Sequence, residues 1–249
     1  MNTTATRVDD IPALTRSEAM AFATDEFGRW LDLLRALTPG EWAAPTECEP
    51  WDVRAMACHL LGATESHASL REMAHQMRAY RGAKDGPMID AMTALQIRDR
   101  AELSPDDVVA RFESAAPRSV RARRRMPGLL RRMPMKVDPP FDRDGWRLGY
   151  LMDVIYNRDL WMHRVDIHRA IGRDMVLTAD HDGRLVADVV AEWARRHGKP
   201  FTLILTGPAG GTFVAGDGGE RIEFDAVEFC RILSGRAQGA GLLTTEVAF

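Results

Sequence analysis

The stretch 148–170, LGYLMDVIYNRDLWMHRVDIHRA, decides the fold of the N-terminal part of the chain. Its apolar residues recur every three or four positions, the period of one face of a helix. Asp159 and His163 interrupt that face, and side chains four residues apart on a helix lie one above the other. The stretch therefore predicts a long helix that directs a carboxylate and an imidazole into an apolar core, on the stripe Leu148, Met152, Ile155, Asp159, Met162, His163 and Asp166.

A third side chain of the same chemistry occurs about a hundred residues earlier. His59 lies on the apolar stripe of a helix expected from about Asp52 to Arg78. A single histidine on such a face is more often a core residue satisfied by one hydrogen bond. Together with Asp159 and His163, however, it completes a set of two imidazoles and one carboxylate. Three protein ligands with a fourth position open are typical of catalytic zinc, so the pattern favours a metal site.

Four amphipathic helices account for the N-terminal part. A capping box at Thr15 and Glu18 begins the first, and Gly172 is expected to end the fourth. We expect helices at 15–37, 52–78, 88–119 in two pieces divided before Ser104, and 144–172. Helices with facing apolar stripes pack as a four-helix bundle.

The C-terminal part has a different pattern. A helix is expected at 180–197, followed by β-rich runs at 201–206, 212–215 and 221–224. Glycine-rich segments within 207–219 divide the runs and predict hairpin turns between successive antiparallel strands. Asp225 is expected to cap a last helix, with Glu228 completing a capping box. The predicted fold class is mainly α with an α+β C-terminal domain, divided into domains 1–173 and 174–249.

Composition excludes several classes of protein. The chain has 249 residues and a formal net charge of −3, which argues against general nucleic-acid binding. No apolar run approaches the ~20 residues of a membrane helix, and the N-terminus carries no hydrophobic signal region. We therefore expect a cytoplasmic protein with no membrane partner. The three cysteines include no CxxC pair, so neither a disulfide framework nor a cysteine zinc cluster is expected.

Three groups of motifs resemble one known family. The segments 40–48, 51–54 and 59–62 resemble the N-terminal signature of the mycothiol-dependent maleylpyruvate isomerase family, whose first domain is a DinB-like four-helix bundle. Asp159-x-x-x-His163-x-x-Asp166 resembles its fourth-helix metal motif, in which Glu usually stands where this chain has Asp159. The C-terminal motifs are similar to the family's second domain, which is related to sterol carrier folds, at 205–207, 225–226, 233–236 and 247–249.

The resemblance implies a zinc ion, or another divalent metal, held by His59, Asp159 and His163. The open position would accept the sulfur of mycothiol, and a metal-bound thiol is a thiolate at neutral pH. The thiolate would attack a small electrophile, as in the isomerases. Asp166 would fix an imidazole tautomer, and Arg236 would hold a substrate carboxylate. The same site would also support a mycothiol S-transferase, or a regulatory module that binds metal or a small ligand without turnover.

Other polar residues carry weaker hypotheses. The basic stretch 118–136 is expected to break helical order and to cover the site, attracting an anionic substrate, although most charge runs are solvated faces. His67 and His75 lie too far along their helix to share an ion with His59, so we expect both to be structural or exposed. His168 should point away from the site, and Cys58 should be a small core residue.

Overall fold

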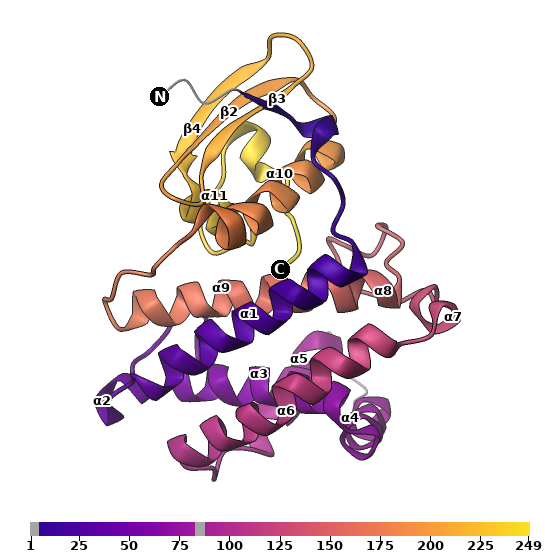
Figure 1. Ribbon diagram of the computed structural model, residues 1–249, viewed down its shortest axis with the longest axis vertical. Helices are drawn as coiled ribbons and strands as arrows, with labels where there is room; N and C mark the ends of the chain where they lie inside the picture. Colours follow the sequence, from indigo (N-terminus) through magenta and orange to yellow (C-terminus); the bar gives the residue numbers. More distant parts are fainter. Residues whose placement is uncertain (1–4, 83–87) are drawn as a thin grey trace. The chain divides into compact units, whose positions relative to one another are not determined.

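The computed structural model describes residues 5–82 and 88–249, and its elements follow the chain as coloured in Figure 1. The chain divides into two compact units: a helical unit, Thr15–Asp174, and an α+β unit that combines the residues up to Leu14 with Met175–Phe249. The expected fold class, mainly α with a smaller α+β part, is confirmed. The units differ from the expected domains at the N-terminus, because Thr6 and Arg7 pair with a strand of the α+β unit.

Four longer helices form the core of the helical unit. These are α1 (Arg16–Arg35), α3 (Val53–Ala68), α6 (Pro105–Arg125) and α9 (Tyr156–Ala170). The shorter elements are α2 (Pro39–Trp42), α4 (Leu70–Gly82), α5 (Met88–Arg98), α7 (Gly128–Arg131), α8 (Leu148–Tyr150) and the π-turn η2 (Leu151–Ile155). The core joins α1, α3, α6 and α9, and in it Trp30 meets Phe112 edge to face at 6.0 Å between ring centroids.

Local capping explains where these helices begin and end. Both legs of the capping box between Thr15 and Glu18 are present at the start of α1, as predicted. A second box, formed by Ser104 and Asp107, begins α6. Gly172 follows α9 with φ +65°, a left-handed conformation that ends helices and that glycine adopts at little cost.

Two predicted helices have different bounds in the structure. The helix expected over 52–78 is broken at Ser69, whose extended backbone ends α3 and whose hydroxyl accepts a hydrogen bond from the Glu72 N–H to begin α4. Serine competes with helical hydrogen bonding in this way. The helix expected from residue 144 begins only at Leu148. The backbone before it bonds instead to the preceding segment, with Met135 N–H donating to Trp146 O and Leu148 N–H to Met133 O.

The α+β unit consists of a small sheet with helices. Its strands are β1 (Thr6–Arg7), β2 (Phe201–Thr206), β3 (Gly211–Ala215) and β4 (Glu220–Asp225), in the order β1-β3-β2-β4. Its helical elements are η1 (Val8–Asp10), η3 (Ala179–Gly183), α10 (Arg184–His197), α11 (Ala226–Leu233) and η4 (Gly241–Thr244). Trp193 of α10 joins these layers, since its ring lies 4.7 Å from that of Phe201 in β2 and 5.3 Å from that of Phe229 in α11.

The strand order corrects the prediction of successive antiparallel strands. β2 and β3 form the expected hairpin, but β4 lies on the other side of β2 and runs parallel to it. The connection 216–219 therefore passes the start of β2 instead of turning back. Glycine permits this passage, because a Cβ on Gly219 would lie 2.1 Å from Pro200 O and its φ is +87°. Asp225 caps α11 as predicted, whereas the Glu228 carboxylate pairs with Arg231 instead of completing the box.

Candidate metal centre

Helices α3 and α9 bring the three predicted ligands together. The Asp159 carboxylate lies between the two imidazoles, with Oδ2 3.7 Å from His59 Nε2 and Oδ1 3.3 Å from His163 Nε2. One ligand atom from each residue lies within 4.8 Å of those of the other two, and the imidazole centroids are 5.6 Å apart. Both histidines are buried, and Asp159 is partly exposed. Small side-chain movements would bring all three donors to the ~2.0–2.2 Å of a zinc bond.

Each imidazole uses its other nitrogen in a hydrogen bond. His163 Nδ1 lies 2.8 Å from Asp166 Oδ2, and His59 Nδ1 lies 2.7 Å from Gln96 Oε1. A carboxylate and an amide oxygen only accept, so Nδ1 carries a hydrogen in both rings, and Nε2 is the atom that faces Asp159 and becomes available to a metal once it is deprotonated. Metal-binding histidines are almost always held by such a partner. The donor set therefore fits zinc in chemistry and in tautomer.

The charges of Asp159 and His163 are strongly coupled. Burial alone would raise the pKa of Asp159, but the neighbouring His163 and His59 outweigh it and lower that pKa well below its usual range. Burial likewise opposes charge on His163, yet Asp159 and then Asp166 raise the pKa of His163 well above its ordinary value. Metal ligands must be deprotonated. A bound cation would therefore take the place of the Nε2 proton that Asp159 favours on His163.

Asp166 lies behind His163, outside the triad. Its side chain is 0% exposed and accepts a hydrogen bond from the Cys48 thiol, with sulfur and oxygen 3.5 Å apart, besides that from His163. Cys48, His163 and Asp166 are themselves close enough to form a second candidate ligand group. This second group and the triad share His163, whose Nδ1 already bonds to Asp166. The arrangement agrees with the outer role expected for Asp166, which stays a prediction.

Trp51 forms a wall of the centre that the sequence analysis did not single out. Its ring lies 5.4 Å from the His59 ring and 6.3 Å from the His163 ring, centroid to centroid. An indole at this distance covers both imidazoles with apolar surface. Gln96 was also missed, because an isolated glutamine on a helix has no spacing that marks it as a partner of a distant histidine.

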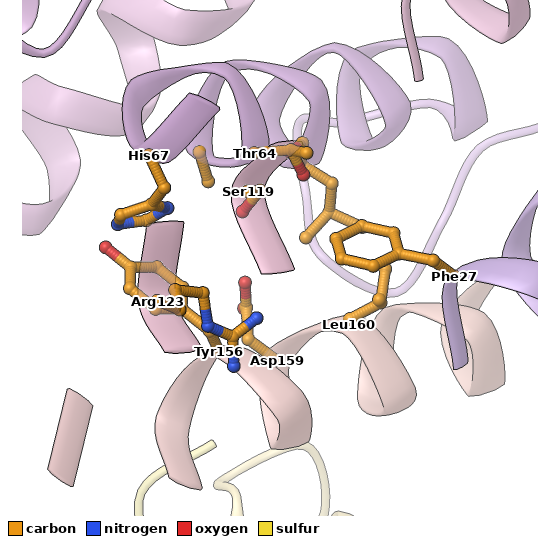
Figure 2. A pocket seen from close by; sticks show the side chains of 10 residues that line it. Phe27, Thr64, His67, Ser119, Arg123, Tyr156, Asp159 and Leu160 are labelled. Atoms are coloured by element: carbon orange, nitrogen blue, oxygen red, sulfur yellow. The ribbon is translucent and has the colours of Figure 1, made fainter. Parts of the chain in front are cut away.

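A pocket opens beside Asp159, and Figure 2 shows the Asp159 carboxylate directed into it. Arg123, 2% exposed, contributes a guanidinium whose Nη2 lies 2.9 Å from Asn157 Oδ1, while Nε and Nη2 bond to Met152 O. Burial lowers the pKa of Arg123 to about 10, so it remains a cation at neutral pH. Tyr156 lies under this cation, with 5.8 Å between Arg123 Cζ and the ring centroid.

His67 closes another side of this pocket. Its ring meets that of Tyr156 edge to face at 4.4 Å. Burial, and then the Arg123 cation, lower the pKa of His67 to about 3, so the imidazole is neutral under ordinary conditions. His67 does not belong to the triad, as expected from its spacing, but it is part of the pocket wall.

The basic stretch 118–136 agrees with the prediction only in part. Its first half continues α6 to Arg125, past the end expected near residue 119, and helical order breaks after that at 126–127, before the short α7. Arginine is a good helix former, and basic side chains stabilise the last turn of a helix. Arg123 points inward, and Arg131 pairs with Asp153. The remaining basic residues are exposed, namely Arg118, Arg121, Arg124, Arg125, Arg132 and Lys136. Their role as a cover stays untested.

The other candidate residues lie apart from the triad. His75 is on the surface with Asp99, its Nε2 2.7 Å from the carboxylate, and His168 Nδ1 donates to Arg164 O at 2.8 Å. Cys58 is buried, and burial raises the pKa of its thiol, in agreement with a core role. Arg236 lies in the α+β unit just after α11, where its backbone N–H bonds to Arg231 O. Its expected contact with substrate stays a prediction.

No helix in the described ranges 5–82 and 88–249 has the length and apolarity needed to span a membrane.

Comparisons with known proteins identify the family and the fold of the chain. The sequence profile of the mycothiol maleylpyruvate isomerase N-terminal domain matches residues 23–168, a range that contains all three triad residues. Among solved structures, the fold resembles a crystal structure of the mycothiol-dependent maleylpyruvate isomerase, with a TM-score of 0.57, 18% identity, and 94% of each chain covered.

A mutant of that isomerase gives a TM-score of 0.56, also at 18% identity, over 93% of this chain and 92% of the other. No curated protein sequence matches significantly. The structural likeness establishes the fold, and the profile covers more than half of the chain. The chain therefore belongs to the mycothiol-dependent maleylpyruvate isomerase family.

Proposed function

We propose that this protein is a cytoplasmic, mycothiol-dependent metalloenzyme that activates the thiol for attack on a small electrophile. One observation carries the proposal: both imidazoles bond through Nδ1 to an outer acceptor and turn Nε2 toward the Asp159 carboxylate. His59, Asp159 and His163 would hold a zinc ion and leave one position open for the thiol sulfur. The family of the chain supports mycothiol as that thiol.

The chemistry of the centre divides between the ion and the chain. When bound, zinc supplies the positive charge that keeps a thiol as its thiolate at neutral pH. To the ion, His59 and His163 would offer Nε2 atoms that have lost any proton, and Asp159 would contribute one negative charge. Trp51 covers the imidazoles on one side and excludes water there, which strengthens electrostatic interactions.

The pocket beside Asp159 supports an anionic electrophile as substrate. Arg123 donates hydrogen bonds to the Met152 carbonyl and to the Asn157 amide oxygen, neither of which carries charge, and Asp153 is paired with Arg131. A buried cation with neutral partners attracts an anion strongly. We infer that Arg123 binds a substrate carboxylate, with the Tyr156 ring beneath its guanidinium. Arg236 is a second candidate for a substrate carboxylate, on the evidence of its family motif alone.

The central test supplies zinc-loaded protein with mycothiol and measures turnover of maleylpyruvate and a panel of electrophiles. Isomerisation supports the proposal as stated, while consumption of mycothiol into a conjugate identifies the S-transferase alternative. In cobalt-substituted protein, mycothiol should produce a sulfur-to-cobalt charge-transfer band and bind more tightly than cysteine or glutathione. Zinc and thiol binding with no turnover of any electrophile would favour the regulatory module. Absence of thiol binding would overturn the mycothiol assignment.

The role of Arg123 needs a separate comparison. Arg123→Met should raise the KM for a carboxylate-bearing electrophile at least tenfold and leave that for a neutral electrophile nearly unchanged. Arg118→Met is the matched control, because Arg118 lies on the same helix and is exposed. An equal effect of Arg123→Met on both substrates would rule out recognition of the anion.

A further inference from the structure

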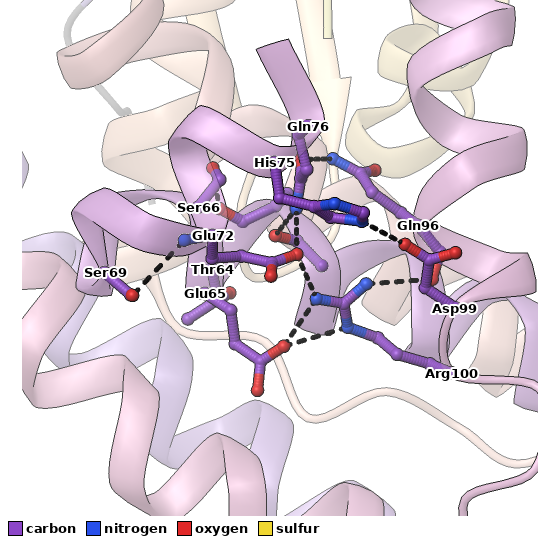
Figure 3. A network of polar contacts seen from close by, with 12 residues as sticks. Thr64, Glu65, Ser66, Ser69, Glu72, His75, Gln76, Gln96, Asp99 and Arg100 are labelled. Carbon is purple, nitrogen blue, oxygen red and sulfur yellow. Dashed lines mark hydrogen bonds and ion pairs between the residues drawn. The ribbon is translucent and has the colours of Figure 1, made fainter. Parts of the chain in front are cut away.

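His59 is the end of a chain of buried amides. Gln96 Oε1 lies 2.7 Å from His59 Nδ1, Gln96 Nε2 lies 3.0 Å from Gln76 Oε1, and Gln76 Nε2 lies 2.9 Å from Gly62 O. Gln76 is 2% exposed and Gln96 is 5% exposed. Figure 3 shows the two amides side by side, each from a different helix, within the polar network of α3, α4 and α5.

The Gly62 carbonyl determines which atom donates in each hydrogen bond between Gly62 and His59. Gly62 O is a backbone carbonyl and only accepts, so Gln76 must present its amide N–H there. The Glu72 carboxylate, 2.8 Å from Gln76 Nε2, also accepts from that nitrogen and therefore selects the same orientation. Gln76 Oε1 must then accept from Gln96 Nε2, which leaves Gln96 Oε1 to face His59. The histidine is left with one option, donation from Nδ1.

Gly62, at the other end of these hydrogen bonds, contributes to them both by its missing side chain and by its carbonyl. A Cβ on Gly62 would lie 2.6 Å from both Cβ and Cγ of Gln96, closer than carbon atoms approach in proteins. The missing side chain therefore allows α5 to come close enough for Gln96 to reach His59. The carbonyl of the same residue orients Gln76, so packing and polarity converge on one position.

Arg100 connects the chain of amides to charged groups. Its guanidinium donates to Glu72 Oε1 at 2.8 Å and to Glu65 Oε2 at 2.6 Å. Glu72 thus has a cationic partner as well as Gln76, which holds its carboxylate in place. The outer end of the chain is consequently fixed by an ion pair, and its inner end meets the metal centre.

We propose that Gln96 and Gln76 are positioning residues of the metal centre, which set the tautomer and orientation of His59 so that Nε2 is available to the ion. The part of this inference that concerns metal affinity rests on the proposed zinc site. The part that concerns the tautomer applies to the metal-free protein as well. Neither glutamine touches the ion or the substrate.

The first experiment measures zinc affinity of the full-length protein by competition with a chelator. Gln96→Met removes the acceptor at nearly constant volume and should weaken zinc binding about 10- to 100-fold, as removal of outer partners of metal ligands typically does. Gln96→Glu keeps an acceptor toward His59 but loses the N–H that donates to Gln76 Oε1, so it should restore part of that loss. Thr93→Val is the matched control, since it removes another buried polar group of α5 that bonds only to Ile89 O in the described contacts. Equal zinc affinity in wild type and a folded Gln96→Met would overturn the inference.

The second experiment reads the tautomer directly, by nitrogen-15 NMR of the imidazoles in metal-free protein at a pH where His59 is neutral. Wild type and Gln96→Glu should show His59 protonated on Nδ1, whereas Gln96→Met should show a mixture of both tautomers. A purely structural glutamine would not change this signal. His59 protonated on Nε2 in wild type would refute the positioning role of Gln96 and Gln76, whatever the zinc affinity. If wild type binds no zinc but shows the Nδ1 tautomer, the proposed function fails and the positioning role of the two glutamines stands.

Discussion

The two histidines of the metal centre are held by opposite chemistry. On α3, His59 bonds to the neutral amide of Gln96, and on α9, His163 bonds to the carboxylate of Asp166. Either partner selects the Nδ1 hydrogen, so tautomer selection requires only an acceptor. Charge is a separate variable. A divalent zinc ion would be balanced by the carboxylates of Asp159 and Asp166, and a third anion in place of Gln96 would weaken the attraction of the ion for a thiolate.

Removal of either imidazole is the severest test of this comparison. Both His59→Ala and His163→Ala should abolish stoichiometric zinc, measured by metal analysis after reconstitution. His163→Ala should also lower the free energy of unfolding of the metal-free protein by about 1–3 kcal/mol more than His59→Ala, because it takes a hydrogen bond from a buried carboxylate and not from an amide. Equal stability of the two variants would show that charge makes no difference between the sides.

Asp166→Asn makes the α9 side resemble the α3 side. Asparagine can still accept from His163 Nδ1, so the tautomer is retained while the negative charge is lost. We expect zinc affinity to fall about tenfold, the lower end of the range for outer partners of metal ligands. Chelator competition measures it, with Gln96→Met as the comparison. Unchanged affinity would mean that the carboxylate acts only as an acceptor.

Acid should lower the stability of the hydrogen-bond network behind His59, because that network ends at the carboxylate of Glu72 on α4. Burial opposes ionisation of Glu72, but the hydrogen bonds from Gln76 and Arg100 outweigh it and lower the pKa of Glu72 below 4.5. A lowered folded pKa stabilises the fold above the unfolded value and loses that effect as pH falls through the folded pKa. Glu72→Gln should therefore be less stable than wild type in urea at pH 7, by about 1 kcal/mol, with the gap narrowing below pH 4.5.

Glu113→Gln provides the control for that titration, since Glu113 is an exposed partner of Arg35. Its effect on stability should be small at pH 7. If the difference in stability between wild type and Glu72→Gln instead grew toward low pH, the pKa of Glu72 would not be lowered by folding.

The smallest change in zinc affinity is expected for a substitution of Asp159, which lies between His59 and His163. Asp159→Glu introduces the residue usual in the family and should bind zinc at least as tightly as wild type. The existing carboxylate already reaches both imidazoles, with oxygens 3.3 and 3.7 Å from the two Nε2 atoms, so little is to be gained. Calorimetric titration with zinc would measure the difference. A large loss of affinity would show that α9 is positioned specifically for the shorter side chain.

The sequence predictions were accurate where a feature depends on residues close together in the sequence, and they failed where it depends on contacts between distant segments. The start of α1, the left-handed Gly172 and the cap at Asp225 depend on neighbouring residues and were predicted. The break at Ser69 has a local cause as well, but its serine lies within an otherwise helical stretch. The position of β4 depends on pairing with β2, which no short-range pattern specifies.

The candidate site follows the same division. Asp159 and His163 were predicted because their spacing on one helix is a signal, and His59 because it lies on an apolar helical face and completes their ligand set, which the family motif then supported. Trp51 lies in the family motif but was given no role, and Gln96 and Gln76 were missed, since their contacts join different helices or loops and leave no period in the sequence. Arg123 was hidden among exposed arginines, and only its place on the inward face of α6 distinguishes it.

The pairing of β1 with β3 makes the helical unit an insertion within the α+β unit, entered after Leu14 and left at Asp174. Thr6 and Phe213 are partners about 200 residues apart in sequence, so their pairing in an unfolded chain would close a very long loop. A folded insertion replaces a long flexible segment by a body of fixed span, which shortens the flexible part of that loop. We therefore expect the insertion to fold before β1 pairs with β3. It follows that a truncation after residue 174 would strand β1 without its partner, and that an isolated helical unit should be produced as Thr15–Asp174.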